Sequence, residues 1–298
     1  MDKYFCEANI LLPDFHKTSG MGWAVIACDQ HTSEPEYWQE AREIAGEAPS
    51  TLDLILPEVY LDETEERVPI INAKMVDYVR DVLVEHRDAM IFLERTLADG
   101  SVRRGLVGCV DLECYEYTRG AESLIRATEG TVLERIPPRV AVRRGASIEL
   151  PHVMILIDDP DKTVIEPIAS VADELATAYD FDLMLGGGHV KGAFVDKARR
   201  DEVNRALAAL ITPEAMSKKY GGEYAPLLFA VGDGNHSLAS AKAAYEEVKA
   251  ALGEAAKDHP ARSALVDSPS SISTPLFPSS PRRVRFIISP WMGVISSL

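Results

Sequence analysis

Side chains that can bind phosphate, a divalent cation and a proton stand next to one another in the stretch Gly232-Asp233-Gly234-Asn235-His236-Ser237. Asp233 can coordinate a metal ion, and His236 can donate a hydrogen bond or transfer a proton. The same residues also fit an ordinary turn, in which glycine supplies a positive φ and Asn or Ser caps a helix. The stretch by itself leaves both interpretations open.

The residues on either side of this stretch predict the elements that position it. The apolar run Leu227–Val231 is short and ends at turn residues, which is typical of a buried strand. From Leu238 onward apolar residues recur at intervals of three and four, which predicts one face of a helix. The turn therefore lies at the N-terminus of a helix, where the helix dipole favours an anion such as phosphate.

A similar order of elements is predicted near the N-terminus. Trp23–Cys28 has the composition of a buried strand, and Tyr37–Ala45 has the pattern of a helix. Between them lies a polar turn that contains Asp29 and Glu34. No sequence repeat relates this stretch to residues 227–252, so only the order of elements is shared.

Basic residues stand beside glycines or apolar residues in two further segments. Arg126 and Arg135 are interspersed with glutamates and apolar residues; arginine suits bidentate recognition of phosphate or carboxylate, and exposed ion pairs are the alternative. Gly186-Gly187-Gly188 precedes His189 and Lys191, which makes a second candidate anion site. Its spacing matches neither the Walker A nor the Rossmann motif.

The alternation of strand and helix patterns predicts an α/β or α+β fold with a mixed sheet and flanking helices. Asp158-Asp159-Pro160, after one predicted strand, is either a metal-binding pair or a turn. The remaining patterns predict strands at 90–96, 103–112 and 152–157, a hairpin at 98–101, and helices at 73–85, 168–179 and 195–211.

The composition limits the classes of partner. The chain has 298 residues and a formal net charge of −16. This charge disfavours nucleic acid as a binding partner, because it repels the phosphate backbone. A small anionic substrate is still allowed, because a bound Mg²⁺ ion can bring phosphate into a site lined by carboxylates. Its four cysteines form no CxxC pair, so we expect reduced thiols and neither a zinc site nor a disulfide framework. No apolar run is long enough for a membrane span and no signal peptide is recognisable, so we expect a cytoplasmic protein.

The end of the chain differs from the rest. Residues 268–298 contain no Asp or Glu and are rich in Ser and Pro. We therefore expect a single catalytic-type α/β domain over residues 1–266, built as one lobe or two, and a poorly ordered tail over 267–298. The oligomeric state does not follow from the sequence.

Four segments together resemble a known family, the bacterial domain of unknown function 1015. They are Ala27-Cys28-Asp29-Gln30 with residues 32–38, Ile125–Arg139, Pro151–Met154 with residues 157–159, and Gly232–Ala239. The resemblance covers about residues 5–266. Four long motifs in the same order are more specific than any single glycine loop.

The resemblance implies phosphoryl transfer to a small alcohol. The Asp-Gly-Asn-His element is similar to a motif of the ParB and sulfiredoxin-like group, which includes nucleotide-dependent serine kinases, and some 1015 members are pyrophosphate-dependent L-serine kinases. We therefore expect transfer from pyrophosphate or a nucleotide to L-serine, with Mg²⁺ as cofactor. A ParB-like nucleotide-binding regulator without turnover and a metal-dependent phosphohydrolase are the alternatives.

This expectation gives each candidate residue a role. Asp233 would bind Mg²⁺ or orient the hydroxyl, and a nearby carboxylate would act as general base. The candidate bases are Asp29, Glu34 and Glu129, the candidate phosphate ligands in the turn are Gly232, Gly234, Asn235, His236 and Ser237, and the candidates for holding phosphate or the carboxylate of the amino acid are Arg126, Arg135, His189 and Lys191.

The C-terminus departs from the family pattern. Family members continue after the region of Pro260-Ala261-Arg262 with a Val-Asn-Ile-His-Asp segment and then Phe-Glu-Pro-Ile-His-Arg, whereas this chain continues with Ser268–Ser273. We hypothesise a frameshift near Asp267 that replaced the natural C-terminal part and can leave this copy inactive. Resequencing the gene tests the hypothesis, which an unbroken reading frame through the present tail would refute.

Overall fold

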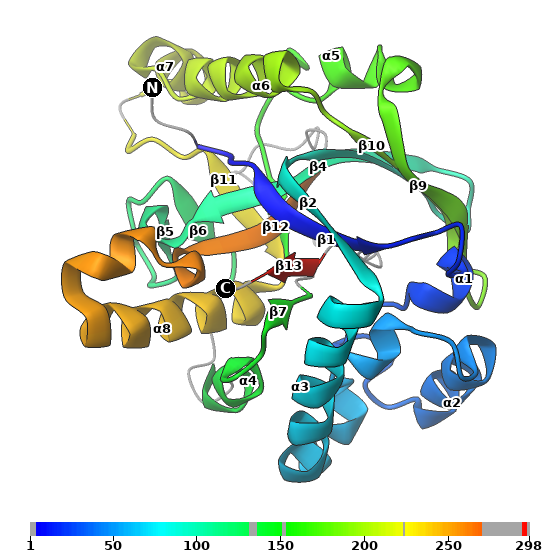
Figure 1. The fold of residues 1–298 in the computed structure, drawn as a ribbon. Coiled ribbons are helices and arrows are strands. Elements are labelled where there is room, and N and C mark those ends of the chain that lie inside the picture. The colour runs from blue at the N-terminus through cyan, green and yellow to red at the C-terminus, as the bar shows by residue number, and fades with distance from the viewer. Residues whose placement is uncertain (1–3, 131–135, 151–152, 223, 270–293, 297–298) are drawn as a thin grey trace.

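The computed structural model describes residues 4–130, 136–150, 153–222, 224–269 and 294–296. Within them lies a large mixed sheet (Figure 1) in which β5–β6, β6–β11 and β8–β12 are parallel pairs and the other neighbours are antiparallel. The predicted α/β fold with a mixed sheet is therefore confirmed. In sheet order its strands are β5 (Tyr115–Glu116), β6 (Ile125–Ala127), β11 (Phe229–Asp233), β8 (Met154–Leu156), β12 (Ser263–Pro269), β4 (Val102–Asp111), β3 (Ile91–Thr96), β10 (Gly188–Phe194) and β9 (Ala176–Leu183).

A small antiparallel sheet packs against one face of the large one. It joins a strand from the start of the chain to one from its end, since β1 pairs with both β2 and β13. In sheet order its strands are β2 (Leu83–Ala89), β1 (Ala8–Pro13), β13 (Val294–Ser296) and β7 (Ile148–Glu149).

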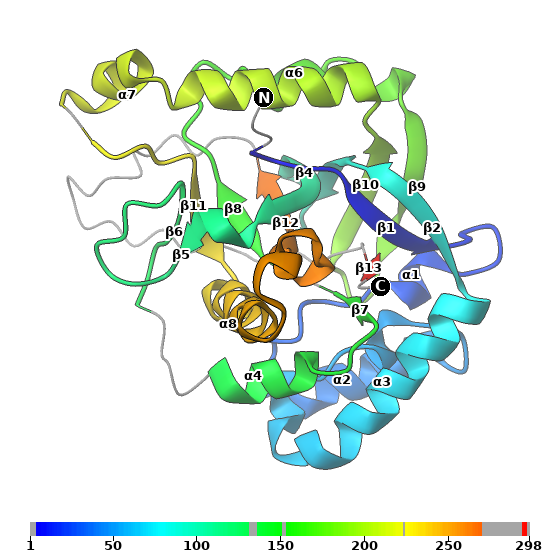
Figure 2. The same ribbon diagram turned by 60° about the vertical axis from the view of Figure 1, so that its left-hand side comes forward.

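Helices complete the layers on both faces of the large sheet. Figures 1 and 2 show α6 and α7 along the top and α4 beside α8 below, with α2 and α3 under the small sheet. No helix in the described part of the chain combines the length and the apolar character needed to cross a bilayer. The helices are α1 (Gly20–Trp23), α2 (Pro35–Ala45), α3 (Thr64–Asp81), α4 (Ile136–Arg143), α5 (Glu166–Ala169), α6 (Lys197–Leu210), α7 (Pro213–Tyr220) and α8 (Asn235–Leu252).

Alternate side chains of the central strands pack into two separate hydrophobic cores, one on each face of the large sheet. On β12, Val266 packs with α6 and α8 on one face, whereas Leu265 packs with α3 and the small sheet on the other. On β4, Leu106 and Val107 divide in the same way. Strands buried on both faces have near-continuous apolar sequences, which is why 90–96 and 103–112 were recognisable as strands.

The predicted strand at Trp23–Cys28 is wrong. Trp23 ends α1, and residues 24–28 form no ladder although most of them are buried. Side chains replace the neighbouring strand here: the Thr51 hydroxyl donates to the Trp23 carbonyl at 2.7 Å and accepts from the Val25 N–H at 3.3 Å. A buried apolar run predicts burial, but its backbone partners can be side chains.

Two predicted helices are also wrong in part. Helix α3 ends at Asp81, and Leu83–Ala89 is strand β2, so the predicted helix at 73–85 begins too late and ends too late. Between 168 and 179 only Ile168 and Ala169 belong to an α-helix, α5; Ala172–Glu174 form a single 3-10 turn, and Ala176 already starts β9. In β9 Tyr179 and Leu183 are buried whereas Asp180 and Asp182 are exposed, which is the period of a strand.

The predicted tail begins inside the large sheet. Asp267, Ser268 and Pro269 are the last three residues of β12, and all three are buried. Of the rest of the predicted tail, residues 294–296 form β13, and residues 270–293, 297 and 298 lie outside the described residues.

A buried ion pair links β12 to β4. The Arg103 Nη2 atom lies 3.0 Å from Asp267 Oδ2, and the Asp267 side chain is completely buried. Gly105 makes room for this carboxylate, since a Cβ there would stand 2.3 Å from Asp267 Oδ1. Burial raises the pKa of Asp267 to about 6, an effect that Arg103 opposes.

We predict that Asp267→Asn changes how stability depends on pH. Because the folded pKa lies above the ordinary value of 3.8, the folded state holds the Asp267 proton more tightly than the unfolded state does. The stability that this proton contributes is complete below a pH of about 4 and is lost as the pH rises through about 6, roughly 3 kcal/mol in all. Relative to wild type, the variant should therefore gain stability over this window.

Urea denaturation of both chains between pH values of about 4 and 7 measures the difference. Asp161→Asn, at an exposed position, is the control and should show no such trend. If the difference in free energy of unfolding between wild type and Asp267→Asn stays constant with pH, the pKa of Asp267 is not raised in the folded state.

Candidate functional site

Strand β11 delivers the stretch Gly232–Ser237 to the start of α8, as the sequence predicts. Gly234 is the residue before the helix and has φ of +74°, a conformation that costs little only for glycine. The Asp233 carboxylate accepts a hydrogen bond from the Gly234 N–H at 2.6 Å, and the first hydrogen bond of the helix runs from Leu238 N–H to the Gly234 carbonyl. The turn thus holds its acid directly at the positive end of a long helix.

The two glycines of this turn are also required by the fold itself. A Cβ at Gly232 would stand 2.8 Å from Leu156 Cγ on the neighbouring strand β8. Asn235 is 4% exposed, and its Nδ2 lies 3.5 Å from Thr128 Oγ1, so its side chain turns toward the end of β6. Gly232, Gly234 and Asn235 therefore have structural roles whether or not a ligand binds.

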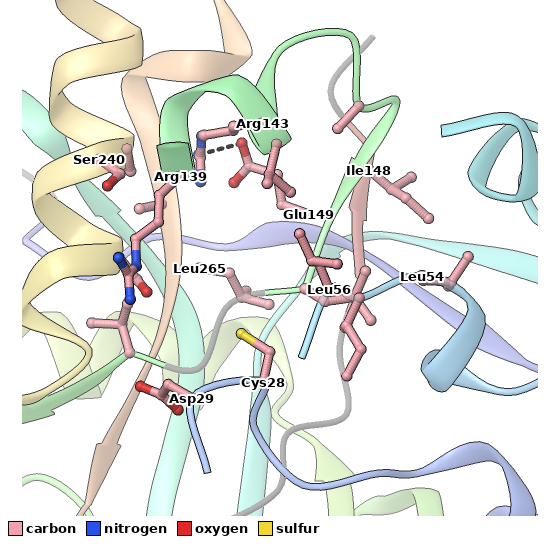
Figure 3. A pocket seen from close by; sticks show the side chains of 18 of the residues that line it. Cys28, Asp29, Leu54, Leu56, Arg139, Arg143, Ile148, Glu149, Ser240 and Leu265 are labelled. Atoms are coloured by element: carbon pink, nitrogen blue, oxygen red, sulfur yellow. Dashed lines mark ion pairs between the residues drawn. The ribbon is translucent and has the colours of Figure 1, made fainter. Parts of the chain in front are cut away.

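A cavity of about 170 Å³ opens beside the N-terminal turns of α8 (Figure 3). Segments far apart in the sequence form its walls: residues 28–29, the segment 54–61, α4 with the strand β7 that follows it, the start of α8, and β12. Each of the four motifs found in the sequence contributes to this wall. Their contributions are Cys28 and Asp29, Arg139, Val153, and Ser237 with Leu238.

The cavity has a polar side and an apolar side. Figure 3 shows Asp29, Arg139 and Ser240 on one side and Leu54 and Ile148 on the other. This division suits a ligand with a charged end and a less polar remainder.

Two arginines of α4, one helical turn apart, face the cavity. Arg139 pairs with Glu58, and Arg143 pairs with Glu149. All four side chains are largely buried, with exposed fractions of 15–21%. Each of these arginines is thus already paired with a carboxylate of the wall, so an anionic ligand must share Arg139 with Glu58 or displace that carboxylate.

A protein family match covers residues 13–268 and therefore every residue of this cavity wall. The chain belongs to the family described as Protein of unknown function (DUF1015). No curated protein and no solved structure matches the chain. The family resemblance seen in the sequence is confirmed, whereas the likeness of the Asp-Gly-Asn-His element to ParB-type proteins and kinases stays a prediction.

Of the candidate bases, Asp29 lines the DUF1015 cavity. Glu34 and Glu129 are not among its lining residues. Glu34 lies 3.1 Å from His31 Nδ1, and the His31 ring stacks on Tyr37. Glu129 is exposed and follows β6. The structure therefore singles out Asp29 among the three carboxylates.

Arg126 supports the backbone next to β11. Its guanidinium donates to the carbonyls of Ser123 and Pro226 at 2.8 Å and of Ala225 at 3.2 Å, and burial lowers its pKa. These bonds hold the loop that leads into β11, so Arg126 has a structural function. Arg135, the other predicted phosphate ligand of this segment, lies outside the described residues.

The second predicted anion site lies elsewhere in the sheet. The glycines 186–188 form the β9–β10 hairpin, and β8, β12, β4 and β3 separate β10 from β11. His189 stands between Asp180 and Asp182, with ring nitrogens 2.9 and 2.8 Å from their carboxylates, and Lys191 pairs with Asp173 at 3.0 Å. His189 and Lys191 therefore face carboxylates and are not brought to the α8 turn.

The acidic pair after β8 forms a turn. The Asp159 carboxylate accepts hydrogen bonds from the N–H groups of Thr163 and Val164 at 2.6 and 2.8 Å, and Asp158 interacts with Lys219 and Tyr220. Within the described ranges no group of three or more His, Cys, Asp or Glu side chains is arranged to hold a metal ion.

Sequence patterns missed most of the charged cavity wall. Three charged residues of the wall belong to no motif: Glu58, Arg143 and Glu149. Arg139 lies at the end of the segment 125–139, from which only Arg126 and Arg135 were predicted as ligands. The spacing of Arg139 and Arg143 was an available signal, because residues four apart share one face of a helix.

We predict that Gly234→Ala destabilises the protein by about 1–2 kcal/mol, because a Cβ at this positive φ meets the following backbone. Gly234→Asn should cost less, since Asn tolerates this conformation better. Urea denaturation measures both. Gly130→Ala, where no atom lies within 4 Å of the added Cβ and φ is not positive, is the matched control. Equal stability of wild type and Gly234→Ala would contradict the geometry of this turn.

Proposed function

We propose that this DUF1015 protein transfers a phosphoryl group from pyrophosphate or a nucleotide to the hydroxyl of L-serine, giving O-phosphoserine. One observation carries the proposal: residues from all four family motifs meet in a single cavity at the start of α8. Phosphoryl transfer requires an anion-binding position, positive charge and a base beside the acceptor hydroxyl. The cavity wall offers a residue type for each requirement.

The donor phosphates bind between α8 and α4 in this proposal. Ser237 lies in the first turn of α8, where the helix dipole favours negative charge. Arg139 faces the same cavity from α4 and can form two parallel hydrogen bonds to a phosphate. Its present partner Glu58 then becomes free to receive the ammonium group of the amino acid.

Asp29 acts as the general base. It takes the proton of the serine hydroxyl while the serine oxygen forms a bond to phosphorus and the bridging oxygen of the donor leaves with its electron pair. Asp233, held through its bond to the Gly234 N–H, stands next to the same helix start and remains the second carboxylate of the proposal. Its role is to orient the hydroxyl or to bind a cation.

Mg²⁺ fits this site as an ion carried by the donor. Such an ion is bound in proteins by one or two carboxylates together with substrate phosphates, so a preformed cluster of three side chains is not required. Asp233 would supply the carboxylate, which leaves Asp29 to act as the base. When bound, the ion neutralises charge on the phosphates.

The assay uses the full chain with L-serine, Mg²⁺ and, in turn, pyrophosphate, ADP and ATP, and it detects O-phosphoserine. Product with at least one donor supports the proposal. Phosphate release that does not depend on serine would instead indicate a phosphohydrolase. Nucleotide binding in calorimetry without product from any donor would indicate a regulatory module.

Two pairs of substitutions distinguish residues of the cavity from their neighbours outside it. We predict that Asp29→Asn lowers kcat by about 10²–10⁴-fold, the usual contribution of a general base, whereas Glu34→Gln leaves kcat nearly unchanged. Arg139→Ala should lower kcat/KM for the donor strongly, whereas Arg144→Ala, directly after the same helix, should not, because Arg144 is exposed and pairs with Glu247. Steady-state kinetics with serine as the varied substrate checks the first pair, and kinetics with the donor varied checks the second.

Thermal unfolding of the four variants controls for misfolding. Equal losses of activity in Arg139→Ala and Arg144→Ala would show that the cavity is not where the donor binds.

A further inference from the structure

Cys6 and Cys109 face each other across two neighbouring backbone segments. The Cys6 N–H donates to the Cys109 carbonyl and the Cys109 N–H to the Cys6 carbonyl, each at 2.8 Å. The two residues therefore form a directly opposed antiparallel pair. Both side chains also contact the same apolar cluster between the two sheets, so they project to the same side of the backbone.

This arrangement is within reach of a disulfide bond. Directly opposed residues of the hydrogen-bonded type have Cα atoms about 5.5 Å apart, close to the commonest separation in disulfides. Their Cβ atoms stand about 4.5–5.5 Å apart and must approach to about 3.5–4.5 Å. The bond therefore needs a small backbone shift, and a disulfide under such strain is easily reduced again.

Neighbouring groups hold Cys6 in this position. The Asn204 side chain on α6 accepts hydrogen bonds from the N–H groups of Tyr4 and Phe5 and donates to the Phe5 carbonyl at 2.9 Å. Gly108 lets the segment lie close to β4, since a Cβ there would stand 2.8 Å from the Cys6 carbonyl oxygen. The two thiols are thus aligned before any reaction, which accelerates a step between them.

The two cysteines differ in access to solvent. Cys6 is half-buried, whereas Cys109 is 2% exposed and burial raises the pKa of its thiol. A small oxidant therefore meets Cys6 first, and Cys109 reacts from inside. This order corresponds to an attacking cysteine and a resolving cysteine.

We infer that Cys6 and Cys109 are a reversible redox modification site that forms a cross-strand disulfide on exposure to a peroxide. The Cys6 thiol loses its proton, and its thiolate attacks one peroxide oxygen. The O–O bond breaks, the leaving hydroxide takes up that proton, and the products are a sulfenic acid and one water. The Cys109 sulfur then attacks the Cys6 sulfur, loses its proton and displaces the hydroxyl as a second water. Two thiols are oxidised by two electrons, and one hydrogen peroxide is reduced to two waters.

The test uses the full chain carrying Cys114→Ser, so that the tryptic peptide 105–119 contains one cysteine. The folded protein is treated with hydrogen peroxide or, separately, with oxidised glutathione, its free thiols are alkylated, and the digest is examined by mass spectrometry. We expect peptide 4–17 to be linked to peptide 105–119 with either oxidant, and the link to disappear after mild reduction. Absence of this link with both oxidants, or a link from Cys6 to Cys28 instead, would overturn the inference.

Two variants test the alignment of the thiols. Cys6→Ser must abolish the linked peptide, and because Cys6 is half-buried this change should be tolerated by the fold. Asn204→Ala should slow cross-linking several-fold while leaving alkylation of Cys6 by a small reagent unchanged or faster. An unchanged rate of cross-linking in folded Asn204→Ala would show that the alignment does not matter and would contradict this part of the inference.

Discussion

Arg103 and Asp267 form an ion pair in which the carboxylate is completely buried and the arginine is 17% exposed. Removing one partner would leave the other charge buried, and a slip of β12 by one residue would turn Asp267 toward the core formed with α6 and α8. The pair therefore fixes the register of β12 between β4 and β8. The cavity depends on that register, because Ala264 and Leu265 of the same strand form part of its wall.

Local patterns predicted the elements whose signals are local. The turn from β11 into α8, the β3–β4 hairpin and helix α6 follow from apolar periodicity and from turn residues. The failures have one cause, which is that tertiary contacts decide between structures of similar local preference. Thr51 bonds the backbone of Trp23 and Val25 in place of a strand, and pairing with β10 makes residues 176–183 a strand. No pattern in the sequence contains these partners.

In the candidate site, too, some residues have a local sequence signal and others are identified only by their tertiary contacts. Asp29 and Ser237 were recognisable as polar residues of the two predicted turns, and the structure brings both to one cavity. Glycine-rich stretches were less informative, because a positive φ serves a hairpin as well as an anion site: the glycines 186–188 close the β9–β10 hairpin. Arg126 likewise combines the right side chain for phosphate with a position that needs its bonds to backbone carbonyls. Only the spatial partners of a residue separate these functions.

The Asn204 side chain takes the place of a strand beside residues 4 and 5, and this has a consequence for how the chain folds during synthesis. Its bond to the Phe5 N–H joins residues that are 199 positions apart in the sequence. Residues 4 and 5 leave the ribosome before α6 does, so their backbone has to wait for this partner, and β1 waits still longer for β13. Such non-local pairing slows folding and leaves an apolar N-terminal segment exposed to other chains until the later elements are made.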